Sequence, residues 1–216
     1  MDTKKIGEDL HEHVPAGWYH ESLKKDFFQR IWHKTRFSQI KKVSENAKNV
    51  LDVGCADGIF SKVVLDSTQA ESLIGIDIIK TSIDWAKKHW KRNTRMKFEV
   101  GDAHKLNFKA NTFDAIYCLE ALEHVADPVV VLGQFKRIMK KGGFGIFLVP
   151  SDNNLFKIVW WLWLTFYPRG WVWKDTHIQT YRGDYLTKAC RKTGFKIELD
   201  KKFNLGMLHL VKVRKV

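Results

Sequence analysis

The chain has 216 residues, of which 44% are hydrophobic and 28% are charged, a composition that fits one globular domain and excludes a disordered or fibrous protein. Its 37 lysines and arginines outnumber 24 acidic residues, giving a net charge of +13, and residues 188–216 hold nine basic residues against two acidic ones. Such charge runs are either solvated helix faces or a surface that attracts an anionic partner, a lipid leaflet or a nucleic acid.

Residues 1–45 are expected to form a helical cap. The first 14 residues contain no apolar stretch of the kind that directs secretion, so a signal peptide is not expected. In residues 21–45, apolar side chains recur near helical spacing, which predicts one or two amphipathic helices. A separate domain is expected to follow over residues 46–216.

From residue 49 onward, short apolar runs alternate with helical stretches. The expected strands are residues 49–54, 72–78, 96–103, 113–120 and 144–150. The expected helices are residues 59–67, residues 82–92 and, within residues 127–143, a helix with Pro128 in its first turn and glycine just after its end. Strands that alternate with helices in this way predict a parallel sheet with helices on both faces.

The end of the chain has a different pattern. A helix is expected near residues 184–193, and two apolar runs, residues 195–200 and 206–213, follow with a short loop between them. A parallel crossover needs about a dozen residues or more, so these two strands must pair antiparallel. The predicted fold class is α/β, a Rossmann-like, mostly parallel seven-stranded sheet with one antiparallel strand near the C-terminus.

A glycine-containing turn, LDVGCADGIF, occupies residues 51–60. In an open parallel sheet, ligands bind outside the carboxyl ends of the strands, where the strand order reverses. A dinucleotide-binding turn would read G-x-G-x-x-G and would face a pyrophosphate. Here Gly54 and Gly58 have a different spacing, and Asp52 and Asp57 flank the place of the phosphate. Two close anions repel each other in a partly desolvated pocket. A cationic ligand would instead be attracted by the two carboxylates. S-adenosylmethionine, with a sulfonium and an ammonium against one carboxylate, is such a ligand.

Two more carboxylates follow the next two strands. Asp77 ends the second strand, where a carboxylate can accept hydrogen bonds from both hydroxyls of a ribose. Asp102 ends the third strand, where it can accept from the amino group of an adenine. A single acid after a strand is often only a helix cap or a turn residue. Acids at three successive strand ends together predict a cationic cofactor that contains adenosine.

In these segments the chain resembles the class I S-adenosylmethionine-dependent methyltransferases, in particular the small-molecule group often called type 11. The resemblance covers residues 49–150 and rests on VLDVGCADG, GIDI, GDAHKLNF, FDAIYCLEALEHVADP and KRIMKKGGFGIFLVP, in this order. It implies that S-adenosylmethionine is bound by Asp52, Gly54, Ala56, Asp57, Gly58, Asp77, Ile78, Asp102, Ala103, Leu119 and Glu120. The chief departure is Ala56, where the family usually has glycine, and a weakened or repositioned cofactor is the expected effect.

Methyl transfer to a hydroxyl needs a general base when the acceptor is protonated. His124, just after the fourth strand, is the candidate catalytic residue, and the alternative is a structural histidine that packs against the following helix. Glu120, Glu123 and His124 would share one face if their segment were helical. Three such ligands make an incomplete site for a hard cation, so no metal is expected.

Residues 152–181 form a tryptophan-rich insertion after the fifth strand, where the resembled family commonly places elements that cover the substrate. The longest apolar run of the chain, residues 158–167, is about half as long as a membrane span. Basic residues flank the tryptophans as in membrane-surface segments, namely Lys157, Arg169 and Lys174. We therefore expect a substrate lid with peripheral contact to an anionic membrane, and the alternative is a short helix packed on the core.

The sequence predicts an S-adenosylmethionine-dependent methyltransferase that acts on a small-molecule or lipid-like acceptor, with oxygen as the expected methylated atom. The expected acceptor contacts are Tyr19, Trp171 and His177. An RNA-directed methyltransferase is the alternative that the charge favours, but CLEALE replaces the Asn/Asp-Pro-Pro-aromatic segment of enzymes that methylate nucleobase amines. A cofactor-binding module without activity is a further alternative. The three scattered cysteines form no metal-type spacing and suit the cytoplasm.

Overall fold

The structure is a computed structural model that describes residues 14–166 and 178–216. Seven strands form one sheet in the order β3-β2-β1-β4-β5-β7-β6. The strands are β1 (Asn49–Val53), β2 (Ser72–Asp77), β3 (Met96–Val100), β4 (Phe113–Leu119), β5 (Met139–Pro150), β6 (Lys196–Phe203) and β7 (Leu208–Arg214). The first five strands pair in parallel, and β7 pairs antiparallel with both β5 and β6. Within the described residues, one strand thus runs against the others, as predicted.

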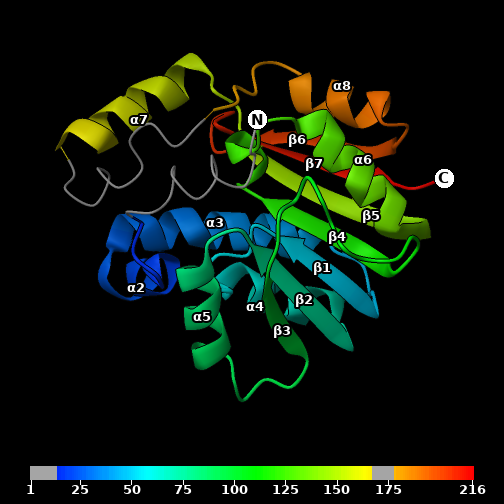
Figure 1. Cartoon of the computed structure of the whole chain (residues 1–216). Coiled ribbons are helices and arrows are strands. Elements are labelled where there is room, and N and C mark those ends of the chain that lie inside the picture. The colour runs from blue at the N-terminus through cyan, green and yellow to red at the C-terminus, as the bar shows by residue number, and fades with distance from the viewer. Residues whose placement is uncertain (1–13, 167–177) are drawn as a thin grey trace.

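Helices cover both faces of the sheet (Figure 1). They are α2 (Trp18–Lys25), α3 (Phe27–Val43), α4 (Ile59–Thr68), α5 (Lys80–His89), α6 (Pro128–Ile138), α7 (Asn154–Phe166) and α8 (Tyr185–Lys192). One core cluster joins Ile40 of α3, Val64 of α4 and Ile83 of α5, and a second joins Leu132 of α6 and Leu186 of α8. The successive side chains of a strand point to opposite faces, so β1 contributes Val50 to the first cluster and Leu51 to the second. The predicted α/β class is confirmed, and the division of the chain at residue 46 stays a prediction.

The segment of residues 127–143 differs from the prediction at its end. Pro128 occupies the first turn of α6, as predicted, and Asp127 caps the helix. The helix ends at Ile138, however, and Met139 already pairs with β4 in the sheet. Met139 is fully buried there, and the two glycines that follow are costly inside a helix. The expected glycine at the helix end therefore lies in β5 instead.

The helix α7 follows β5 and projects from one end of the sheet (Figure 1). Of its 13 residues, Phe156 is the one that is buried. A helix of this length measures about 20 Å, which is shorter than the ~30 Å hydrocarbon core of a bilayer. No helix in the two described ranges is long and apolar enough to cross a membrane.

Candidate active site

A pocket lies at the carboxyl ends of β1, β2, β3 and β4, and we call it the strand-end pocket. The strand order reverses at β1, and open α/β sheets bind ligands at such a point. The residues predicted from the sequence that line it are Tyr19, Gly54, Ala56, Asp57, Asp77, Ile78, Asp102, Ala103, Glu120 and His124. Asp52, Gly58 and Leu119 are not part of this lining. The individual roles of all these residues stay predictions.

The turn between β1 and α4 brings the backbone to the pocket in a left-handed conformation. The φ angles of Gly54, Ala56 and Gly58 are 74°, 46° and 77°. The N–H of Ala56 donates to Oδ2 of Asp77 at 2.8 Å, a bond that helps to hold an alanine in a conformation that glycine adopts more readily. A Cβ atom at Gly54 would overlap the methyl group of Ala121. The turn therefore tolerates alanine at position 56 and requires glycine at position 54.

Hydrogen bonds orient the carboxylates of Asp77 and Asp102. Asp77 also accepts from the N–H of Ile79 at 2.9 Å. Oδ1 of Asp102 accepts from the N–H of His104 at 2.8 Å and lies 2.9 Å from Nδ1 of the same residue. Acceptors that are oriented before a ligand arrives lose less conformational entropy on binding it. The two strand ends thus present fixed carboxylates to the pocket.

Asp52 and Asp57 are buried, with 1% of each residue exposed. Asp52 accepts from the hydroxyl of Ser61 at 2.6 Å. Asp57 accepts from the N–H groups of His20 at 2.8 Å and Ile59 at 3.2 Å. Burial raises the pKa of Asp52 to about 7 and the pKa of Asp57 to about 6, because it removes water from the charged form. Through its hydrogen bond with the N–H of His20, Asp57 connects the start of α2 to the turn. The helix α2 forms part of the pocket wall.

We expect Asp52 to make the free energy of unfolding depend on pH. Its pKa is about 7 in the folded protein against about 3.9 in an unfolded chain. The stability that it contributes is therefore full below about pH 4 and is lost as the pH rises through about 7. The Asp52→Asn variant should lose this dependence and keep a partner for Ser61. Urea unfolding of the cofactor-free protein between about pH 5 and about pH 8 measures it.

The difference between parent and variant is the informative quantity in this titration. Burial lowers the pKa of His33 to about 2, and a lowered histidine pKa makes stability rise with pH, the opposite sign. That contribution is common to both proteins and cancels in the difference. If the free energies of unfolding of the parent and the variant changed with pH in the same way, the prediction would be contradicted.

The described lining of the strand-end pocket is acidic. Carboxyl groups come from Asp57, Asp77, Asp102 and Glu120, and no lysine or arginine occurs among the described lining residues. A phosphate would meet these carboxylates without a compensating cation, whereas a sulfonium and an ammonium are attracted by them. The donor set therefore fits S-adenosylmethionine, and Asp77 and Asp102 would hold its adenosine part.

A second pocket adjoins the first, and we call it the apolar pocket. The helices α3 and α7 supply most of its lining, through Phe28, Ile31, Trp32, Phe156, Val159, Trp160, Leu162, Trp163 and Phe166. Both pockets are lined by Trp18, Tyr19, Glu120 and His124, which form a common wall. A molecule in the apolar pocket thus lies next to the contents of the strand-end pocket.

A partly buried ion pair lies at the common wall. Arg36 of α3, which is 2% exposed, contacts the carboxylate of Glu120. The second terminal nitrogen of Arg36 lies 2.9 Å from Nδ1 of His33, whose ring is neutral because burial lowers its pKa to about 2. Arg36 was not predicted as a site residue from the sequence. Its signal is an arginine four residues before the buried Ile40, on the inner face of an amphipathic helix.

Glu123 and His124 belong to a short 3₁₀ turn, η1 (Leu122–His124). Glu123 is 2% exposed, and burial, with Glu120 nearby, raises the pKa of its carboxyl well above the usual range. Its side chain lies on the wall of the apolar pocket, where burial favours the protonated carboxyl. The shared helical face considered for Glu120, Glu123 and His124 does not form, since Glu120 precedes the turn with a φ of 57°. No group of three or more His, Cys, Asp or Glu in the described ranges could hold a metal ion.

The three predicted acceptor contacts have different outcomes. Tyr19 lies on the common wall, and burial raises the pKa of its phenol far above the usual range, so the phenol is neutral. Trp171 and His177 lie outside the described residues. Tyr19 therefore stays a predicted substrate contact, with a position that suits the role.

Comparison with known proteins identifies the family. A family described as a methyltransferase domain matches residues 20–199. The chain is 28% identical over 160 residues to a ubiquinone biosynthesis O-methyltransferase of Coxiella burnetii, an alignment that covers 73% of this chain and 67% of that protein.

Solved structures share the fold. A possible histamine N-methyltransferase of Thermotoga maritima matches with a TM-score of 0.73 at 17% identity, covering 98% of this chain and 100% of that one. The N-methyltransferase NodS of Bradyrhizobium japonicum, solved with S-adenosyl-L-homocysteine, matches with a TM-score of 0.67 at 17% identity, covering 99% of each chain. The family match spans most of the chain, and the strand-end pocket has the charge that the cofactor requires. The chain therefore belongs to the class I S-adenosylmethionine-dependent methyltransferases.

Proposed function

We propose that this enzyme transfers a methyl group to an oxygen of an extended, largely apolar small molecule. The observation that carries the proposal is the common wall of the two pockets, where Tyr19, Glu120 and His124 lie. The strand-end pocket is acidic and suits a cationic methyl donor, and the apolar pocket suits a hydrophobic acceptor. The O-methyltransferase name of the Coxiella burnetii relative supports oxygen as the acceptor atom.

The residues of the common wall suggest how the chain promotes the reaction. S-adenosylmethionine, when bound, supplies an activated methyl group on a sulfonium. The chain aligns the acceptor oxygen with that group by confining the two molecules to adjoining pockets. His124 accepts the proton of the acceptor hydroxyl as the new bond forms. Glu123 offers a neutral carboxyl to the acceptor, and Arg36 holds Glu120 in place.

We expect the His124→Gln variant to transfer methyl groups about 100-fold more slowly than the parent, the usual contribution of a positioned base. Glutamine is of similar length and cannot take the proton, so the affinity for S-adenosyl-L-homocysteine should stay within about threefold. Tritium transfer from labelled S-adenosylmethionine into a chloroform extract of cells measures the rate, and isothermal titration measures the affinity. The control is His89→Gln on α5, since His89 lines neither pocket. Equal rates of methyl transfer by the parent and the His124→Gln variant would show that His124 is not the general base.

The same assay tests the function itself. Tritium should appear in the chloroform-soluble fraction and not in total RNA. Label in RNA alone would favour the RNA-directed alternative, and label in neither fraction would contradict the proposal. Alkaline treatment of the labelled product distinguishes an ether from a methyl ester, because only the ester releases methanol.

A further inference from the structure

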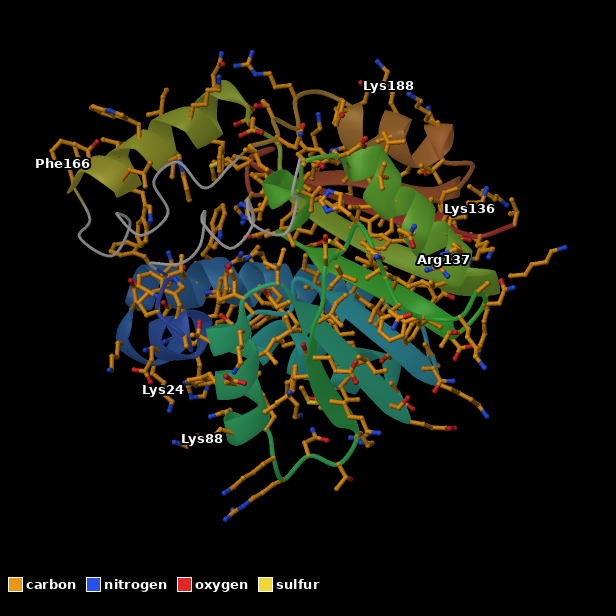
Figure 2. All side chains as sticks on the ribbon, in the orientation of Figure 1. Lys24, Lys88, Lys136, Arg137, Phe166 and Lys188 are labelled. Atoms are coloured by element: carbon orange, nitrogen blue, oxygen red, sulfur yellow. The ribbon has the colours of Figure 1, made fainter. Side chains whose placement is uncertain are left out.

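Exposed apolar side chains border the apolar pocket on two helices. On α3, Phe27 is 66% exposed and Phe28 is 70% exposed. On α7, Trp161 is 59% exposed and Phe166 is 71% exposed. Figure 2 shows Phe166 at the end of that helix that lies farther from the sheet. Large apolar side chains gathered in this way mark a surface that meets a partner or a lipid phase.

Some of these side chains have no part in either pocket. Phe27, Ile158 and Trp161 are absent from both linings, although they are 66%, 57% and 59% exposed. Substrate contact in the pockets therefore does not account for them. These side chains make the surfaces of α3 and α7 apolar outside the two pockets as well.

The helices on this side of the apolar pocket are also basic. Residues 18–43, which span α2 and α3, hold seven lysines and arginines against two acids, and α7 holds one lysine and no acid. Lys24, Lys34 and Lys157 are exposed, and Lys24 lies on the same side of the molecule as Phe166 in Figure 2. Exposed aromatic residues combined with lysines are typical of helices that lie in the interface of an anionic membrane.

We propose that α3 and α7 dock the mouth of the apolar pocket onto an anionic lipid bilayer, with their exposed aromatic side chains among the acyl chains. Lys34, Lys157 and Lys24 of the adjacent helix α2 would lie at the headgroups. The proposal rests on the proposed function, because a hydrophobic acceptor dissolved in the bilayer would enter the pocket directly. A second copy of this chain suits the surface less well, since two basic surfaces repel each other. The predicted membrane contact thus extends to α3, a helix outside the tryptophan-rich insertion.

Co-sedimentation with lipid vesicles tests the docking surface. The probes are vesicles of phosphatidylcholine with about 30% phosphatidylglycerol and vesicles of phosphatidylcholine alone. The parent should bind the anionic vesicles, and added salt should weaken that binding. The double variant Phe27→Gln/Trp161→Gln should bind about 10-fold less. Its methyl transfer to a detergent-dispersed lipid extract should be unchanged, because neither residue lines a pocket.

Matched control variants distinguish vesicle binding through this surface from nonspecific apolar adsorption and from nonspecific attraction between charges. The apolar control is Val130→Gln, at a residue of α6 that is 45% exposed, and it should bind like the parent. The charge arm is Lys24→Gln/Lys34→Gln/Lys157→Gln, which should weaken binding. Its control is Lys188→Gln/Lys192→Gln on α8, which should leave binding unchanged, because Lys188 lies on the opposite side of the molecule from Phe166 in Figure 2.

Three results would overturn the proposal. They are equal binding by the parent and the Phe27→Gln/Trp161→Gln variant, equal sedimentation with both kinds of vesicle, and a dimer in lipid-free buffer that this variant dissociates. The last result would assign the surface to a second copy of the chain. Vesicle binding requires neither methyl donor nor acceptor, so a failed transfer assay and a failed docking assay are distinguishable.

Discussion

The Gly54→Ala variant should bind S-adenosyl-L-homocysteine about 100-fold more weakly than the parent, a loss of about 3 kcal/mol. Gly54 has a φ of 74°, and the left-handed conformation costs an alanine about 1 kcal/mol. The added methyl group would also overlap the Cβ atom of Ala121, which lines the strand-end pocket. Relief of this overlap shifts the segment that carries Glu120. Isothermal titration with S-adenosyl-L-homocysteine measures the loss.

Another glycine of the chain provides the control for this variant. A Cβ atom at Gly133, inside α6, would meet no atom within 4 Å. The Gly133→Ala variant should therefore keep the parent's affinity and gain about 0.5 kcal/mol of stability. Thermal unfolding of both variants separates a binding defect from loss of the fold. An affinity of the Gly54→Ala variant within about threefold of the parent would show that the turn has room for a side chain.

The Arg36→Met variant should lower the free energy of unfolding by about 3 kcal/mol. Arg36 is 2% exposed and pairs with Glu120, which lies 84 residues away in the chain. Methionine fills a similar volume but leaves the carboxylate of Glu120 without its counter-charge in a largely desolvated place. Urea denaturation at neutral pH measures the change.

A double variant identifies the cause of this destabilisation. In Arg36→Met/Glu120→Gln the uncompensated charge is gone, so about half or more of the lost stability should return. The exposed pair of Lys62 and Asp66 gives the comparison, since Lys62→Met should cost less than about 1 kcal/mol. A single Arg36→Met variant that is as stable as the parent would show that the ion pair has no net effect on stability.

The strand ends were predictable because their signals are local. Asp77 and Asp102 each end an apolar run, and parallel strands bring such ends to one edge of the sheet. The same reasoning located Gly54 and Ala56 in the turn between β1 and α4. A parallel sheet thus converts a pattern along the chain into a cluster in space, and this is why the strand-end pocket could be predicted from sequence.

The common wall was only partly predictable, because it depends on contacts between distant segments. Arg36 meets Glu120 only after α3 has packed against the sheet, and no local pattern fixes that register. Burial of Glu123 also follows from the surrounding structure and not from its neighbours in sequence. The end of α6 was misplaced for a similar reason, since the pairing of Met139 with β4 outweighs the local helical pattern.

The arrangement of the two pockets has a consequence for how relatives of this enzyme diverge. The rigid sheet supplies the carboxylates that suit the methyl donor, whereas α2 contributes to the walls of both pockets and α3 to the wall of the apolar pocket. Substitutions in these two helices can change which acceptor the enzyme binds, and they leave the strands undisturbed. Substitutions that accumulate in residues 18–43 are therefore a route to new specificities, while the chemistry of methyl transfer is retained.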